Sequence, residues 1–288
     1  MSMIPEFFKD CVVAIGTEVE AVKGETKKVY IGTGFLVGCC INTQEKDQKK
    51  QYEIYLVTNK HVVIGKKRML VKFNGTEASK DYIINLLDKD GNMLYSFCND
   101  PSVDIVAVRI NPYALINDSS TFAYFDLNAH ALTIEKMKEQ EIAEGDFVYT
   151  LGFPMNLVDQ QKSVPICRMG CISYISHILK YGIKNINYFI DSQTFPGNSG
   201  GPVIIRPEIS SINGTKSHNS AALIGILHSY IPYNDKCISL QTGEIVQVRQ
   251  ENSGLTLVHP VDLIIETIEK ERIRIQNISK LQEENNKI

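Results

Sequence analysis

The chain has 288 residues, of which 43% are hydrophobic and 22% are charged, so it can bury two modest cores or one large one. Its formal net charge of −3 argues against a basic surface for nucleic acid. Apolar runs such as Ala221–Leu227 are too short to span a membrane, and the N-terminal residues do not resemble a secretory signal. Seven cysteines without an obvious pairing are expected to stay reduced. We therefore expect a cytoplasmic protein that binds neither nucleic acid nor membrane.

Short segments rich in β-branched and aromatic residues predict strands as far as residue 260. Clusters of Gly, Asn, Asp and Pro separate these segments, and helical periodicity is weak among them. The pattern is typical of an all-β barrel or sandwich and not of alternating βαβ units. The predicted strands are Val12–Ile15, Val29–Val37, Tyr52–Thr58, Met69–Phe73, Ile105–Ile110, Phe147–Leu151, Cys171–Ile175, Tyr188–Asp191, Val203–Ile205 and Leu223–Leu227.

Several segments between the predicted strands are polar or mixed in composition. Pro112–Gly145 suits a connection between two β units, and a helical turn is expected within it over Ile134–Gln140. The other three are expected to be variable surface loops, the first of them a hairpin tip. These loops are Asn42–Gln51, Pro207–Ser220 and Asn234–Gly243.

The last segment, Val261–Ile288, contains no Gly or Pro, and its isoleucines recur at helical spacing. This pattern predicts a C-terminal helix whose first half packs on the β body. The second half, Gln276–Ile288, is polar, which favours a solvated helix end. A regulatory protein partner that docks on this half is the alternative.

The segment from Phe195 to Pro202 places one serine among three glycines and two prolines. Such a composition predicts a tight turn whose backbone can approach a ligand closely. The amides of Gly197 and Ser199 can converge there on one point, where two donors would hold the oxyanion of a tetrahedral intermediate. A plain turn would not need this run of residues.

A serine that attacks a carbonyl group needs a base, and the base needs a group that orients it. His61 ends an apolar strand, and Asp104 begins another one, where a carboxylate is costly to bury without a partner. Each residue alone is more often structural than catalytic. Together, His61, Asp104 and Ser199 stand in the chain order of an acyl-transfer triad.

Seven segments match motifs of one known family in chain order: Gly32–Val37, Thr58–Val63, Asp104–Val108, Leu151–Pro154, Arg168–Ser173, Gly197–Pro202 and Leu223–Ile226. The GNSGGP motif around Ser199 matches the nucleophile motif of that family unchanged. Together these segments resemble the trypsin-like serine peptidases with the chymotrypsin double β-barrel, especially their HtrA-like branch. The resemblance covers the chain from about Val12 to Val261.

The resemblance implies two six-stranded antiparallel β-barrels followed by a C-terminal α-helix. The first barrel would lie in residues 1–115 and the second, with its preceding linker, in residues 116–260. Residues 261–288 would form the helix, since about thirty residues cannot form a PDZ domain such as often follows the barrels in the HtrA-like branch.

The resemblance also implies the activity, a serine endopeptidase that hydrolyses peptide bonds of protein or peptide substrates through an acyl-enzyme on Ser199. His61 would be the general base and Asp104 its orienting partner. The amides of Gly197 and Ser199 would form the oxyanion hole. No cofactor is expected for this chemistry.

One position departs from the pattern of the digestive relatives. Asn198 stands where those relatives carry an aspartate that pairs with a freed N-terminus, and an amide cannot form that ion pair. Activation by N-terminal cleavage is therefore not expected. We expect the activity to be gated in another way, through the C-terminal helix or through ordering of the oxyanion loop.

The predicted substrate pocket has no carboxylate at its base, because the resemblance places Gln193 there. A basic side chain is therefore not expected to be favoured at the cleavage site. His228 and Tyr230 are bulkier than usual for this family, and Tyr230 narrows the entrance in favour of small or medium apolar side chains. The predicted substrate-binding residues are Gln193, Thr194, His228, Ser229, Tyr230 and Gly254.

Two other functions stay open from the sequence, a catalytically silent peptide-binding module and an esterase on the same site. The intact set of His61, Asp104 and Ser199 argues against the silent module. No metal site is expected, because the histidines follow no ligand pattern. Cys167 and Cys171 are interpreted as buried thiols and not as zinc ligands.

Overall fold

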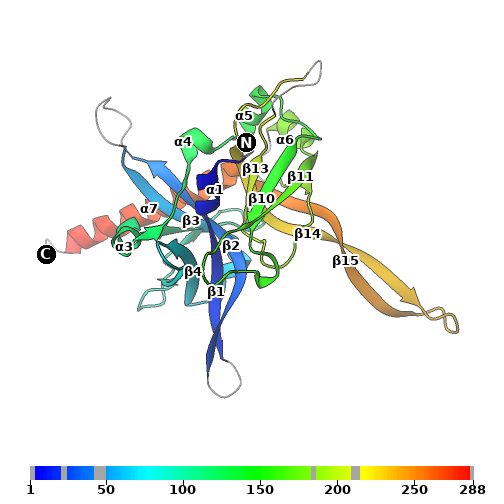
Figure 1. Cartoon of the computed structure of the whole chain (residues 1–288), viewed down its shortest axis with the longest axis horizontal. Coiled ribbons are helices and arrows are strands. Elements are labelled where there is room, and N and C mark those ends of the chain that lie inside the picture. Colours follow the sequence, from blue (N-terminus) through cyan, green and yellow to red (C-terminus); the bar gives the residue numbers. More distant parts are fainter. Residues whose placement is uncertain (1–3, 21–24, 42–49, 183–185, 209–214, 286–288) are drawn as a thin grey trace.

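The computed structural model describes residues 4–20, 25–41, 50–182, 186–208 and 215–285. Strands are the main regular structure, in two units that contact each other through β1, β2 and β10, and a long helix ends the chain (Figure 1). The expected all-β fold of the chymotrypsin type with a C-terminal helix is confirmed.

The N-terminal unit is a curled nine-stranded sheet in the order β5-β4-β1-β2-β3-β7-β6, with β8 on β4 and β9 on β2. Its core includes Leu36, Leu56 and Val106, which are buried on neighbouring strands. The expected six-stranded barrel stays open here, because β6 has only two residues and, among the described strands, pairs only with β7. The strands are β1 (Val12–Glu20), β2 (Thr26–Cys40), β3 (Tyr52–Thr58), β4 (Arg68–Gly75), β5 (Lys80–Asn85), β6 (Ser96–Phe97), β7 (Val106–Ile110), β8 (Ser120–Thr121) and β9 (Phe125–Asp126).

The C-terminal unit is a closed barrel of six strands in the order β10-β11-β12-β15-β14-β13. Buried aliphatic residues such as Val148, Ile190 and Val258 fill its interior. Burial of these side chains from every strand is what favours closure. The strands are β10 (Phe147–Gly152), β11 (Ile166–Tyr174), β12 (Tyr188–Asp191), β13 (Pro202–Ile205), β14 (Ala222–Ile238) and β15 (Ile245–Pro260).

Short helices connect the strands, and α5 confirms the helical turn expected within the linker between the units. It begins after Thr133, whose hydroxyl accepts a hydrogen bond from the amide of Lys136 and so caps the helix. The short helices are α1 (Glu6–Asp10), α2 (Lys60–Val63), α3 (Pro112–Asn117), α4 (Leu127–His130), α5 (Ile134–Glu139), the 3₁₀ turn η1 (Pro154–Asn156) and α6 (Ser176–Tyr181).

The C-terminal helix α7 (Val261–Asn285) packs its first half on the β body, as expected, because Ile264 and Ile268 are buried. Glu271 is buried as well, and its carboxylate accepts hydrogen bonds from Ser96 and Arg274. Ile278, about two turns further along, is exposed. The contact with the β body therefore ends within the helix.

The hairpin of β14 and β15 extends away from the barrel as a long two-stranded arm (Figure 1). The prediction of a loop over Asn234–Gly243 is wrong for its first half, because β14 continues to Ile238. Asn234 and Asp235 are poor strand formers alone, but Asp235 stands opposite Arg249, an opposite-charge pair that supports the strand. Residues 42–49 and 209–214 of the other two predicted loops lie outside the described residues.

Candidate active site

His61 and Asp104 meet at the edge of the N-terminal unit. His61 lies in α2, directly after β3, and its backbone amide donates to Asp104 Oδ1 at 2.9 Å. Its ring Nδ1 lies 2.5 Å from Asp104 Oδ2. Burial would raise the pKa of the Asp104 carboxyl, but the hydrogen bonds and charge of His61 outweigh burial and hold that pKa below its usual value. The carboxylate thus stays ionised and fixes the imidazole.

Two more histidines surround the same aspartate. Nε2 of His228 lies 3.5 Å from Asp104 Oδ2, and Nε2 of His259 accepts a hydrogen bond from the Asp104 amide at 3.1 Å. Their rings stack on each other with centroids 4.7 Å apart. Burial lowers the pKa of both, that of His259 to about 4, so both rings are neutral at pH 7. His259 follows no local motif, and sequence reasoning assigned it no role.

The turn that carries Ser199 can be built only with glycine at key positions. Gly197 and Gly200 have φ angles of +100° and +84°. A Cβ at Gly197 would lie 2.3 Å from the carbonyl oxygen of Phe153, and one at Gly200 would lie 2.2 Å from that of Thr33. The glycines of the motif therefore meet a steric need of this turn.

Thr33 of β2 ties the turn to the N-terminal unit. Its hydroxyl donates to the carbonyl of Gly197 at 2.6 Å and accepts from the amide of Phe153 at 3.0 Å. Its own amide donates to the carbonyl of Ser199 at 2.9 Å. One buried threonine thus fixes the position of Ser199 relative to the strands that precede His61.

The peptide bond between Pro196 and Gly197 is oriented by the 3₁₀ turn η1. The amide of Met155 donates to the carbonyl of Pro196 at 2.7 Å. Because a trans peptide directs its C=O and N–H to opposite sides, the N–H of Gly197 points away from η1. Within the described part of the chain, the amides of Gly197 and Ser199 donate to no other group. They are therefore left for a ligand.

The turn η1 is itself held in an unusual conformation. Met155 and Asn156 both have positive φ angles, +53° and +58°. The side chain of Asn156 accepts a hydrogen bond from the amide of Tyr30 at 2.9 Å, which docks η1 on β2. Such a left-handed pair is strained unless its surroundings hold it. The role of η1 could not be predicted, because the contacts join residues far apart in the sequence.

A hollow of about 220 Å³ opens beside Ser199 and His61. Of the predicted substrate-binding residues, Thr194, His228, Ser229 and Tyr230 line it, as does Thr256, which the sequence did not single out. Gln193 is exposed and does not line it, and neither does Gly254. The described residues that line it include no carboxylate.

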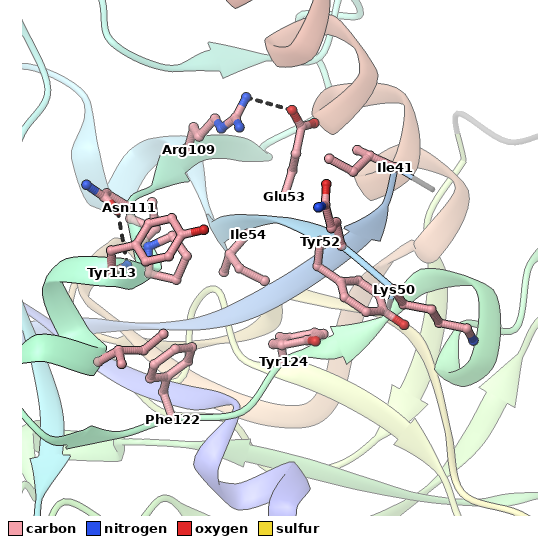
Figure 2. A pocket seen from close by; sticks show the side chains of 14 residues that line it. Ile41, Lys50, Tyr52, Glu53, Ile54, Arg109, Asn111, Tyr113, Phe122 and Tyr124 are labelled. Carbon is pink, nitrogen blue, oxygen red and sulfur yellow. Dashed lines mark hydrogen bonds and ion pairs between the residues drawn. The ribbon is translucent and has the colours of Figure 1, made fainter. Parts of the chain in front are cut away.

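A larger cavity, of about 710 Å³, lies on the N-terminal unit and contains none of the predicted site residues (Figure 2). Tyr52, Phe122 and Tyr124 lie on one side of it. On another side, Arg109 Nη1 forms an ion pair with Glu53 Oε1 at 2.8 Å. The size of this cavity alone does not connect it with the chemistry of Ser199.

Two other kinds of feature, a metal site and a membrane-spanning helix, are absent from the described ranges. No group of three or more His, Cys, Asp or Glu side chains there is arranged to hold a metal ion. The prediction that Cys167 and Cys171 are buried is wrong, because Cys167 is exposed and Cys171 is half-buried on β11. None of the helices in those ranges is long and apolar enough to cross a membrane.

Comparisons with known proteins point to one family. The model of the family described as "Trypsin-like peptidase domain" matches residues 32–206. Similar solved structures include the HtrA-type protease AlgW with a decapeptide, at 16% identity and a TM-score of 0.44 over 92% of this chain and 65% of that one. The MamO protease domain from Magnetospirillum magneticum has 14% identity and a TM-score of 0.44, covering 90% and 96%. The inactive form of the Rv3671c protease of M. tuberculosis has 17% identity and a TM-score of 0.42, covering 91% and 89%. The chain spans about two thirds of the AlgW chain, and no curated protein matches it.

Proposed function

Since the chain belongs to the family of trypsin-like peptidase domains, we propose that it is a serine endopeptidase that hydrolyses peptide bonds of protein substrates through an acyl-enzyme on Ser199. The observation that carries this proposal is the meeting of His61 and Ser199 at one hollow, with Asp104 bonded to the far side of the imidazole. Two amides of the same turn remain available to an oxyanion.

The proposed reaction has two halves, acylation and deacylation of Ser199, and His61 acts as base and then as acid in each of them. Ser199 Oγ attacks the scissile carbonyl carbon while Nε2 of His61 takes its proton, and the ionised Asp104 stabilises the imidazolium. The tetrahedral intermediate collapses, the C–N bond breaks, and His61 returns the proton to the leaving amine. Water then attacks the ester with the same base, which frees Ser199 and releases the acid.

The amides of Gly197 and Ser199 are proposed to stabilise the negative oxygen of each intermediate. One such donor typically contributes about 3 to 4 kcal/mol to the transition state. Because Met155 already holds the Pro196 carbonyl away from this point, the donors need no rearrangement when substrate arrives. Gating by ordering of the oxyanion loop is therefore not part of the proposal, and the exposed half of α7 is the proposed place of control.

The hollow supports a preference for small or medium apolar side chains next to the scissile bond. At its wall the hydroxyl of Thr194 donates to that of Thr256 at 2.9 Å, and the Thr256 hydroxyl donates to the carbonyl of Ser192 at 2.7 Å. Tyr230 lines it, and its lining within the described residues includes no carboxylate that would attract a cation. A cytoplasmic location is proposed on the grounds of cysteine usage, and the seven cysteines are thiols in the structure.

The test is cleavage of an unfolded protein and of a peptide library by the wild type and by variants. We expect Ser199→Ala to abolish cleavage and Asp104→Asn to lower kcat by about 10⁴-fold. Ser176→Ala, a serine outside the hollow, is the matched control and should cleave at the wild-type rate. Equal cleavage by Ser199→Ala would refute the proposal, and a profile dominated by Arg or Lys would refute the preference.

A further inference from the structure

The larger cavity, of about 710 Å³, lies at the far end of the strands that lead to His61 and Asp104 (Figure 2). β3 begins in the cavity at Tyr52 and ends just before α2, which contains His61. β7 begins just after Asp104 and ends in the cavity at Ile110. Among the described residues, the cavity shares no lining residue with the hollow beside Ser199. Its volume lies within the range of about 300 to 1,000 Å³ that is usual for small-molecule sites.

Aromatic rings form one side of this cavity, those of Tyr52, Phe122 and Tyr124 (Figure 2). Two of these rings are fixed by residues behind them. The hydroxyl of Tyr52 donates to Asp126 Oδ2 at 2.7 Å, and the ring of Tyr124 packs so closely on Gly38 that a Cβ there would lie 2.3 Å from it. Because aromatic rings attract one another in offset-stacked and edge-to-face contacts, this wall favours an aromatic ligand over an aliphatic one.

Apolar side chains that line the cavity are exposed to solvent. Tyr113 and Ile116, both on α3, are 72% and 57% exposed. Apolar surface of this kind marks a binding site when it gathers in one concave place, whereas single exposed apolar side chains are ordinary. A ligand in the cavity would therefore cover apolar surface that the folded chain leaves in water.

Hydrogen-bond donors line another side of the cavity, where Arg109 lies across from Tyr124 (Figure 2). Arg109 pairs with Glu53 through Nη1 only. A guanidinium has five N–H donors, and within the described residues the others of Arg109 bond to no group. The side-chain oxygen of Asn111 accepts from the amide of Tyr113 at 3.1 Å, which leaves the Asn111 NH₂ group to donate. Arg109 and Asn111 are two residues apart in extended backbone and so project from the same side of it.

Glu53 is the one carboxylate that lines the cavity within the described residues, and its oxygens are already used. Oε1 faces Arg109, while Oε2 accepts from Arg272 Nε at 3.0 Å and from the hydroxyl of Tyr55 at 2.9 Å. Lys50 also lines the cavity and forms no ion pair with a described residue. The lining thus has two positive charges and a single negative charge that is already satisfied. This balance favours an anion and disfavours a cation.

We propose that this cavity is a binding site for a small aromatic carboxylate, with its ring against Tyr124 and Phe122 and its carboxylate on Arg109 and Asn111. The planar fork of a guanidinium matches the two oxygens of a carboxylate, and such charge-assisted hydrogen bonds are stronger than neutral ones. The site lies apart from the hollow and does not depend on cleavage by Ser199. It can therefore be tested whether or not the protein proves to be a hydrolase.

The test is isothermal titration calorimetry of the full chain with three probes: 2-naphthoate, the uncharged 2-naphthamide and the aliphatic octanoate. Arg109→Gln removes the cation that is proposed to hold the carboxylate, and Glu53 keeps Arg272 and Tyr55 as partners. Tyr113→Ala removes an exposed ring from the lining. Because 2-naphthamide has the shape of the acid without its charge, it reports whether a variant keeps the shape of the cavity.

The chain offers a matched control for each variant. Arg68→Gln removes an arginine that also pairs with a glutamate, Glu18 at 2.7 Å, away from this cavity. Tyr181→Ala removes a tyrosine of similar exposure, 65%, on the short helix α6. Both controls should bind all three probes as the wild type does.

We expect the wild type to bind 2-naphthoate about tenfold more tightly than 2-naphthamide and about threefold more tightly than octanoate. Arg109→Gln should weaken 2-naphthoate binding about tenfold and leave 2-naphthamide binding unchanged. Tyr113→Ala should weaken binding of both naphthalene probes about threefold. Absence of binding at millimolar 2-naphthoate, or equal affinity in the wild type and both cavity variants, would overturn the inference. Octanoate binding as tight as that of 2-naphthoate would overturn the aromatic class in favour of aliphatic acids.

Discussion

Acid should destabilise this protein through His259, and one substitution should remove the effect. The ring of His259 is 1% exposed and accepts a hydrogen bond from the amide of Asp104 through Nε2, so the folded state needs it neutral. Its pKa is lowered from 6.5 to about 4, first by burial and then by the neighbouring His228. Near pH 6, His259 therefore binds a proton in the unfolded chain but stays neutral in the folded one.

The size of the effect follows from the two pKa values. Because the folded value lies below the unfolded one, the neutral ring contributes its full stability above pH 6.5, and this contribution is lost as the pH falls towards 4. Between pH 7 and pH 5 the free energy of unfolding should fall by about 2 kcal/mol from this group. His130 and His228 also have pKa values lowered by burial, so the wild type should lose more than this amount.

The assay is urea unfolding of the wild type and of His259→Gln at pH 7 and at pH 5. Glutamine can still accept the hydrogen bond from Asp104 but does not titrate. The variant should lose about 2 kcal/mol less than the wild type between the two pH values, whatever its stability at pH 7. An equal loss in both proteins would refute the reasoning that His259 is held neutral by the fold.

Two further predictions concern the contacts that position the hollow, and a third concerns the packing of α7. Asn156→Ala removes the hydrogen bond to the amide of Tyr30 and disfavours the positive φ angle at this residue of η1. In steady-state assays kcat should therefore fall about tenfold, with little change in KM. An unchanged kcat would contradict the role of η1. Thr33→Val leaves two backbone partners of the hydroxyl unsatisfied, the carbonyl of Gly197 and the amide of Phe153, and should cost about 2 to 4 kcal/mol in urea unfolding; a cost below about 1 kcal/mol would count against the tie between the units. Ile268→Ala should cost about 2 to 4 kcal/mol and exposed Ile278→Ala less than about 0.5, as judged by thermal unfolding; equal costs would show that α7 packs differently.

Features with local sequence signals could be predicted well. Segments rich in β-branched and aromatic residues predicted most strands, and isoleucines at helical spacing predicted the first half of α7. The composition around Ser199 predicted a turn with glycines where the structure has φ angles of +100° and +84°. The motifs also predicted His61, Asp104 and Ser199 as one site; in the structure, His61 contacts Asp104 and lines the same hollow as Ser199. Their chemical roles stay a proposal.

Features that depend on distant partners could not be predicted. Asn234 and Asp235 read as a loop because their strand is stabilised only by the residues opposite them on β15. His259 is bonded to Asp104, which lies 155 residues away in the sequence. Asn156 of η1 is bonded to Tyr30, which lies 126 residues away. The resemblance placed Gln193 at the base of the pocket, but Gln193 is exposed and does not line the hollow, whereas Thr256 does.

Covalent labelling with a fluorophosphonate tests the central claim most directly. The reagent reacts only with a serine that a neighbouring base activates and whose phosphoryl oxygen is held by an oxyanion hole. At pH 7.5 the wild type should gain one adduct, located by mass spectrometry on the peptide that contains Ser199, and His61→Ala should gain none. A wild-type protein that stays unlabelled under conditions that saturate trypsin, or that is labelled equally in both forms, would contradict the account.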